Sequence, residues 1–128
     1  MIRIHGLTEQ ARGNSKTNED AFCAISYGAD QVIAVVADGV TQPTNAAGKY
    51  PDHIAAQASS IACRRIPAAL IRADREQHFL HEQMRRAVKE ANDAIHDFNR
   101  QTHRWKIRDW RHRDRICTTM AAAWLFPT

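Results

Sequence analysis

The 128-residue chain is 44% hydrophobic and carries a formal net charge of +4 at pH 7, which suits one modest domain or a piece of a larger one. Its three cysteines are far apart and lack a C-x-x-C pair, which argues against a disulfide framework and a zinc knuckle. Residues 1–6 have no apolar signal region and the longest apolar runs are too short to cross a bilayer, so we expect a cytoplasmic protein without a membrane span.

The first predicted element is a β-hairpin. Residues 20–27 and 31–37 are apolar runs, partly β-branched or aromatic, and they are separated by the short turn Gly28-Ala29-Asp30. The second run is apolar at nearly every position, which predicts a strand covered on both faces. Asp38 is then expected where this strand gives way to a loop.

Two helices and a further strand are predicted after the hairpin. Asp52 can cap a helix that ends near Pro67, and a longer helix is expected from about Asp74 to Arg100. Ile116 to Phe126 is a strand-like run, so the order of elements favours an α+β fold with antiparallel pairing. The longer helix has an apolar stripe at spacings of three and four, formed by Leu80, Met84, Ala87, Val88, Ala91, Ala94, Ile95 and Phe98.

Carboxylates stand beside both strands of the predicted hairpin. Glu19 and Asp20 precede the first strand, and Asp38 with Gly39 follows the second. Carboxylate, carbonyl and water oxygens are the ligands that Mg²⁺ and Mn²⁺ prefer, so these residues are candidate metal ligands. The alternative is that Asp38-Gly39 begins an ordinary turn and that Glu19-Asp20 is a solvated loop.

Five short motifs follow one another along the chain: Arg12-Gly13, Asn18-Glu19-Asp20-Ala21-Phe22, Val35-Val36-Ala37-Asp38-Gly39-Val40, Gly48-Lys49 before a helix, and Cys117-Thr118-Thr119 opening a strand. Together they resemble the first motifs of the type-2C metal-dependent serine/threonine protein phosphatases, the PPM family. Their order and predicted secondary structure agree with that family over essentially the whole chain. Residues 1–128 are therefore interpreted as the N-terminal part of a PPM-type phosphatase domain.

The resemblance implies a partial four-layer αββα sandwich, in which antiparallel sheets are flanked by helices and two Mg²⁺ or Mn²⁺ ions lie between the sheets. In the family these ions activate a water that attacks the phosphorus of phosphoserine or phosphothreonine in a protein substrate. By position, Asp38 resembles the aspartate that bridges both ions, and Gly39 resembles the residue whose carbonyl binds one of them. Glu19 resembles a ligand of that same ion, and Asp20 is expected nearby, acting through a coordinated water.

Two features of the family pattern are altered or absent. The family has a phosphate-binding arginine a few residues before its glutamate, where this chain has Ser15, so Lys16 or Arg12 is the candidate to bind substrate phosphate. The family's later Asp-Gly and Asp-Asn motifs supply two more metal-binding aspartates, and this chain has no second Asp-Gly and no Asp-Asn. The hypothesis is thus a truncated metal-dependent phosphatase, with a non-catalytic phosphatase-like interaction or regulatory domain as the alternative.

The excess positive charge is concentrated in residues 103–115. This window holds six Lys/Arg and two Asp, which leaves twelve basic and twelve acidic residues elsewhere. Its two tryptophans, Trp105 and Trp110, could stack on bases while the cations contact phosphates, which would make a nucleic-acid-binding module. We favour a loop in which the tryptophans pack inward and the arginines remain in water.

The predicted last strand also suggests a mode of association. It ends at Leu125-Phe126-Pro127, and an unpaired edge strand is a template for pairing with another chain. We therefore expect self-association through an exposed sheet edge.

Overall fold

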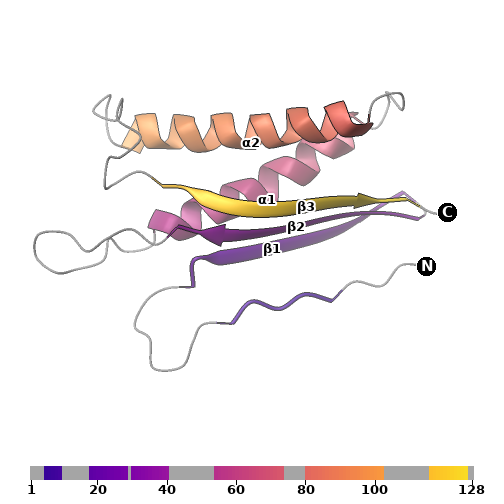
Figure 1. The fold of residues 1–128 in the computed structure, drawn as a ribbon, viewed down its shortest axis with the longest axis horizontal. Coiled ribbons are helices and arrows are strands. Elements are labelled where there is room, and N and C mark those ends of the chain that lie inside the picture. Colours follow the sequence, from indigo (N-terminus) through magenta and orange to yellow (C-terminus); the bar gives the residue numbers. More distant parts are fainter. Residues whose placement is uncertain are drawn as a thin grey trace, which may run out of the picture.

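The computed structural model describes residues 5–9, 18–28, 30–40, 54–73, 80–102 and 116–126. In these ranges three strands form one antiparallel sheet in the order β1-β2-β3, and both helices lie on one side of it (Figure 1). The predicted α+β class is confirmed, and of a four-layer sandwich the described residues contain one sheet and one helical layer. The elements are β1 (Asp20–Tyr27), β2 (Gln31–Gly39), α1 (Ile54–Ala73), α2 (Leu80–Thr102) and β3 (Thr118–Leu125).

The β1–β2 hairpin forms as the two apolar runs around the glycine turn predict. Its register runs from the Asp20–Asp38 pair to the Tyr27–Gln31 pair, and Gly28 takes a φ of 64°, a conformation that glycine adopts at no steric cost. The end of β2 differs from the prediction, because Asp38 lies within the strand rather than in a loop. Pairing continues there because β3 aligns with the same end of β2, opposite Gly39 as well as Asp38.

Helix α1 lies across the sheet and is longer than predicted. The expected end near Pro67 is wrong, because the helix continues to Ala73 with the proline inside it. Pro67 lacks the amide that would bond the Cys63 carbonyl, which normally breaks or kinks a helix. Here Ile66, Pro67 and Leu70 are all fully buried, so their packing against the sheet outweighs that loss. The predicted cap, Asp52, lies outside the described residues.

Helix α2 packs on α1 and shows a stripe that is partly different from the predicted one. Leu80 and Val88 are exposed, whereas the polar residues Gln83 and Asn99 are buried. These two polar side chains find partners, since Gln83 Nε2 donates to the Ala73 carbonyl over 3.1 Å and the Asn99 amide bonds the backbone of Ile116. The expected start near Asp74 falls among residues 74–79, which are not described, and the helix ends at Thr102.

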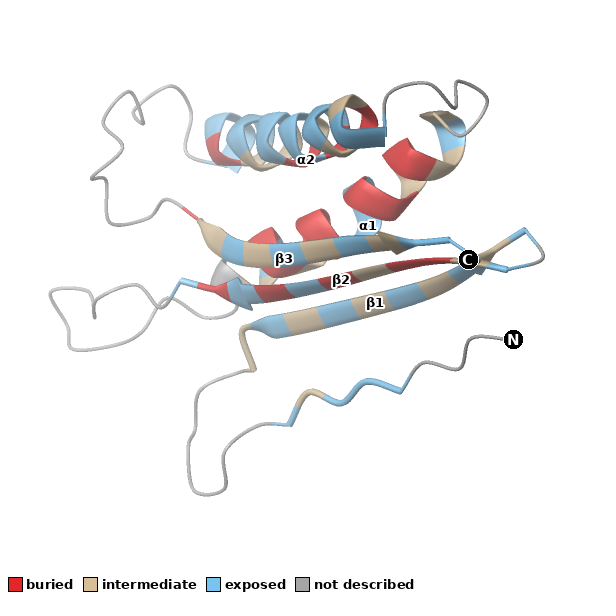
Figure 2. Ribbon diagram, turned by 45° about the vertical axis from the view of Figure 1, so that its right-hand side comes forward, coloured by how far each residue is buried: buried red, intermediate tan, exposed pale blue. Residues whose placement is uncertain are grey.

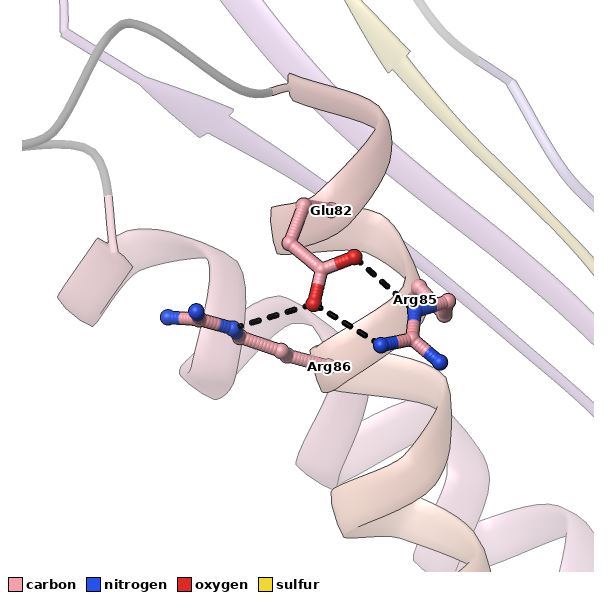
Figure 3. A network of polar contacts seen from close by, with 3 residues as sticks. All are labelled: Glu82, Arg85 and Arg86. Carbon is pink, nitrogen blue, oxygen red and sulfur yellow. Dashed lines mark hydrogen bonds and ion pairs between the residues drawn. The ribbon is translucent and has the colours of Figure 1, made fainter.

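The solvent side of α2 is held by ion pairs within the helix. Glu82 accepts from Arg85 at 2.9 and 3.0 Å and from Arg86 at 3.4 Å (Figure 3). These contacts lower the pKa of Glu82 to about 2, with the Arg85 hydrogen bond as the largest cause. Such exposed pairs at spacings of three and four support a helix only modestly.

The core lies between the sheet and α1 (Figure 2). The inward side chains of β2 pack there with α1 and with the small residues Ala87 and Ala91 of α2. A second cluster joins Ala58 and Ile61 of α1 to Ile116, just before β3. The two helices and the last strand are therefore fixed to one another through buried apolar contacts.

On the other face of the sheet Val36 and Asp38 are exposed, so the prediction that β2 is covered on both faces is wrong there, although Val32 on the same face is 2% exposed. Val36, in the central strand, is 59% exposed on this side. We call this side the outer face. It comprises Asp20, Phe22, Ala24 and Ser26 of β1, Val32, Ala34, Val36 and Asp38 of β2, and Thr119, Ala121, Ala123 and Leu125 of β3.

Candidate metal centre

Two of the predicted ligands meet at one end of the outer face. Asp20 and Asp38 are direct cross-strand partners in the β1–β2 hairpin, and both lie on the outer face. Two facing carboxylates repel each other when both are ionised. The register of the hairpin thus creates a pair of facing carboxyl groups.

The chain before Asp20 is fixed by a set of polar contacts. Asn18 Oδ1 accepts from the Asp20 amide over 3.0 Å, and Asn18 Nδ2 donates to Thr8 Oγ1 over 3.0 Å. The carbonyl of Glu19 accepts from the Gly39 amide at 3.1 Å and from the hydroxyl of Ser59 at 2.5 Å. Because Ser59 is fully buried in α1, the backbone next to Asp20 is tied to the core helix.

Strand β3 fixes the other side of the pair. The Thr118 hydroxyl donates to the Asp38 carbonyl over 2.8 Å, and the Val40 amide donates to the Cys117 carbonyl over 3.1 Å. Thr119 is the cross-strand partner of Asp38 on the outer face, so one row contains two carboxyl groups and a hydroxyl. In the sequence the Thr118-Thr119 pair is only part of a motif, and the cross-strand register is what adds Thr119 to the candidate site.

The electrostatics of the row are those of crowded carboxyl groups. The pKa of Asp20 is raised, first by partial removal of its carboxyl from water, then by the hydrogen bond to Asp38 and by the charges of Asp38 and Glu19. A divalent cation placed between the carboxylates would cancel the repulsion between them. The donor set suits a hard ion such as Mg²⁺ or Mn²⁺, which commonly keeps several waters and uses one or two carboxylates.

The sequence predictions for this site have mixed outcomes. Asp20 and Asp38 lie together, Gly39 adjoins them in β2, and Glu19 is near enough for its charge to act on Asp20. No cluster of three or more His, Cys, Asp or Glu side chains suited to a metal ion occurs in the parts of the chain that are described. The predicted phosphate ligands, Arg12 and Lys16, lie outside those parts, as does the basic window 103–115.

Comparison with known proteins adds no assignment. The chain matches no model of a known protein family and no curated protein sequence. Among the described residues, no helix has the length and apolar character needed to cross a membrane.

Proposed function

We propose that this chain carries the metal-binding part of a PPM-type serine/threonine protein phosphatase. The observation that supports the proposal best is the facing of Asp20 and Asp38, which come from different strands and were both expected to act at one metal site. The proposed substrate is a phosphoserine or phosphothreonine protein, and the proposed cofactor is Mg²⁺ or Mn²⁺, with two ions in a complete site. A cytoplasmic location fits the free thiols of its three cysteines and is part of the proposal.

Each residue has a defined part in this scheme. Asp38 and Asp20 would hold the cation with their carboxylates, and Gly39 would offer its carbonyl beside them. The bound cation would supply Lewis-acid activation of water and a counter-charge for the phosphate. Ser59 would act through position alone, because its hydroxyl fixes the Glu19 carbonyl next to the carboxylate pair. Lys16 or Arg12 would orient the substrate phosphate.

A second candidate function is a phosphatase-like interaction domain that does not hydrolyse its partner. It is favoured by the small donor set, because the described residues bring together two of the three predicted carboxylates rather than a full cage. Mg²⁺ and Mn²⁺ bind weakly when most of their ligands are waters. This candidate predicts metal binding without turnover.

Hydrolysis of p-nitrophenyl phosphate and of a phosphothreonine peptide, with Mn²⁺ or with EDTA, tests the proposal. We expect slow turnover that requires Mn²⁺ and falls by at least about 100-fold in Asp38→Asn, as for loss of a group that positions the reacting water. Asp30→Asn is the matched control, because Asp30 is an exposed carboxylate in the hairpin turn of the same sheet.

The outcomes separate the two candidates. Manganese-dependent turnover that is lost in Asp38→Asn and kept in Asp30→Asn supports the phosphatase. Manganese binding without any turnover favours the interaction domain. Turnover that survives Asp38→Asn would place the reaction elsewhere and contradict the proposed site.

A further inference from the structure

Two of the three cysteines lie in the interface between the sheet and α1. Cys63 is a core residue of α1 and is 6% exposed, and Cys23 of β1 packs against the same core cluster. Both thiols are free. Residues 24–62 separate them in the sequence, so the packing of α1 on the sheet is what brings them together (Figure 1).

The register of the β1–β2 hairpin fixes the position of Cys23. Its direct cross-strand partner is Val35. The Gly39 amide donates to the Glu19 carbonyl over 3.1 Å, and in an antiparallel ladder such hydrogen-bonded pairs recur at every second position. Cys23 and Val35 are therefore also a hydrogen-bonded pair, in which the Val35 carbonyl points toward the Cys23 amide.

Cys63 reaches the same point from the helix. Its thiol donates to that same Val35 carbonyl, with Sγ 3.9 Å from the oxygen. The Val35 carbonyl thus has the backbone of Cys23 at its tip and the sulfur of Cys63 beside it. Because the Cys23 side chain also turns toward the core, the two thiols face each other across the interface.

The electrostatics of Cys63 agree with this placement. The pKa of its thiol is raised to about 11, first by burial and then by the charge of Cys23. A charge on Cys23 can act on Cys63 in this way only when the two sulfur atoms are close to each other.

We propose that Cys23 and Cys63 form a reversible disulfide bond when the chain meets a small-molecule disulfide such as glutathione disulfide. A disulfide requires two cysteines on adjacent backbone segments with their Cβ atoms turned toward each other. The contacts of the Val35 carbonyl supply this arrangement in the folded chain. The bond would join β1, an edge strand of the described sheet, to the core helix α1.

The exchange proceeds in two steps. The partly exposed Cys23 thiol loses its proton to water, and its sulfur attacks one sulfur of glutathione disulfide, which gives a mixed disulfide and releases one glutathione thiolate. The Cys63 thiol then loses its proton and attacks the Cys23 sulfur, which releases the second glutathione thiolate. The two cysteines lose two electrons in total, and glutathione disulfide gains them.

Burial makes this exchange slow. It raises the pKa of both thiols, so only a small fraction of either is a thiolate at neutral pH. The bond is therefore a response to sustained oxidation rather than a fast sensor, and a reducing compartment keeps both thiols free.

The bond has a measurable effect on stability. It closes the loop of residues 24–62, which contains β2 and the first part of α1. A cross-link over a loop of this length restricts the unfolded chain and so favours the folded state. We expect the melting temperature to rise by at least about 5 °C on oxidation.

Peptide mapping of the 128-residue chain after incubation with glutathione disulfide in EDTA tests the inference. Trypsin, used without reductant, places the three cysteines in separate peptides, residues 17–49, 50–64 and 116–128, so each pairing has its own mass. We expect peptides 17–49 and 50–64 to be linked, and we expect dithiothreitol to reverse both the link and the rise in melting temperature.

Three variants sharpen the test. Cys117→Ser is the matched control and should form the same bond, because Cys117 takes no part in the pair. Cys63→Ala should stop at the mixed disulfide on Cys23, since the second thiol is missing. Cys23→Ala should leave Cys63 unmodified, because the exposed thiol that starts the exchange is absent.

Four results would overturn the inference. They are a mixed disulfide on Cys23 that persists in the parent chain, a link that uses Cys117, a link that forms only in concentrated urea, and a melting temperature that does not rise. No metal ion takes part in this test, so its failure is distinguishable from failure of the proposed metal site.

Discussion

Replacement of Asn99 by leucine tests how the last strand is attached to the helices. Asn99 is 2% exposed, and its side-chain amide makes two hydrogen bonds with the backbone of Ile116, which is itself fully buried. The Ile116 amide donates to Asn99 Oδ1 over 2.9 Å, and Asn99 Nδ2 donates to the Ile116 carbonyl over 3.1 Å. Ile116 directly precedes the segment that pairs with the metal-site end of β2, so this contact supports the candidate site from behind.

The magnitude follows from what leucine cannot do. It has the same branching and number of side-chain heavy atoms as asparagine, but it leaves one buried amide and one buried carbonyl of Ile116 without a partner, and each such group costs about 1–3 kcal/mol. Leucine recovers about 1 kcal/mol by burying apolar surface. We therefore expect Asn99→Leu to lower the free energy of unfolding by about 3 kcal/mol.

Urea unfolding followed by far-UV circular dichroism measures this loss. Asn92→Leu is the control, because Asn92 is an exposed asparagine on the same helix, and its effect should stay within about 0.5 kcal/mol. If Asn99→Leu cost less than about 1 kcal/mol, the two hydrogen bonds would not hold the entry to β3, and the reasoning would be refuted.

Three further predictions concern titration and reactivity. The pKa of Asp20 is raised, so its stabilising contribution is present below about pH 3.8 and is lost as the pH rises through the raised value. In EDTA, Asp38→Asn should therefore raise the unfolding free energy at pH 7 and leave it unchanged at pH 3. Equal melting temperatures of the two chains at pH 7 would contradict this. Burial raises the pKa of the Cys63 thiol to about 11. At pH 8 a maleimide should therefore modify Cys23 and Cys117 before Cys63, as read by peptide mass spectrometry. Preferential labelling of Cys63 would contradict this prediction. The hydrogen bond from Arg85 lowers the pKa of Glu82 to about 2, so its stabilising contribution is present above the unfolded pKa near 4.5 and is lost as the pH falls toward 2. In Glu82→Gln the urea midpoint should depend less on pH between 4.5 and 2 than in the parent chain. An unchanged pH dependence would refute the role of the ion pair.

The sequence predicted the elements whose signals are local. The hairpin followed from two apolar runs around a glycine turn, and α2 followed from spacings of three and four. The α+β class followed from the order of these elements. Asp38 was correctly associated with Asp20, because two strands joined by a short turn must bring their far ends together.

The errors share one physical cause, which is that tertiary contacts overrode a local rule. Pro67 should end a helix, yet it is fully buried and α1 continues past it to Ala73. Asn99 belongs to the polar side by type, yet the backbone of Ile116 gives it two partners in the core. An apolar run cannot show whether both faces of β2 are covered, and Val36 proves to be exposed.

Direct measurement of Mn²⁺ binding tests the central claim, that the Asp20–Asp38 pair holds a divalent cation. Electron paramagnetic resonance of free Mn²⁺, titrated with the chain at pH 7.5, reports bound ion without requiring catalysis. We predict a dissociation constant below about 1 mM, weakened at least tenfold by Asp38→Asn and unchanged by Asp30→Asn. Absence of binding at about 10 mM Mn²⁺, or equal binding by the Asp38→Asn chain, would contradict the account.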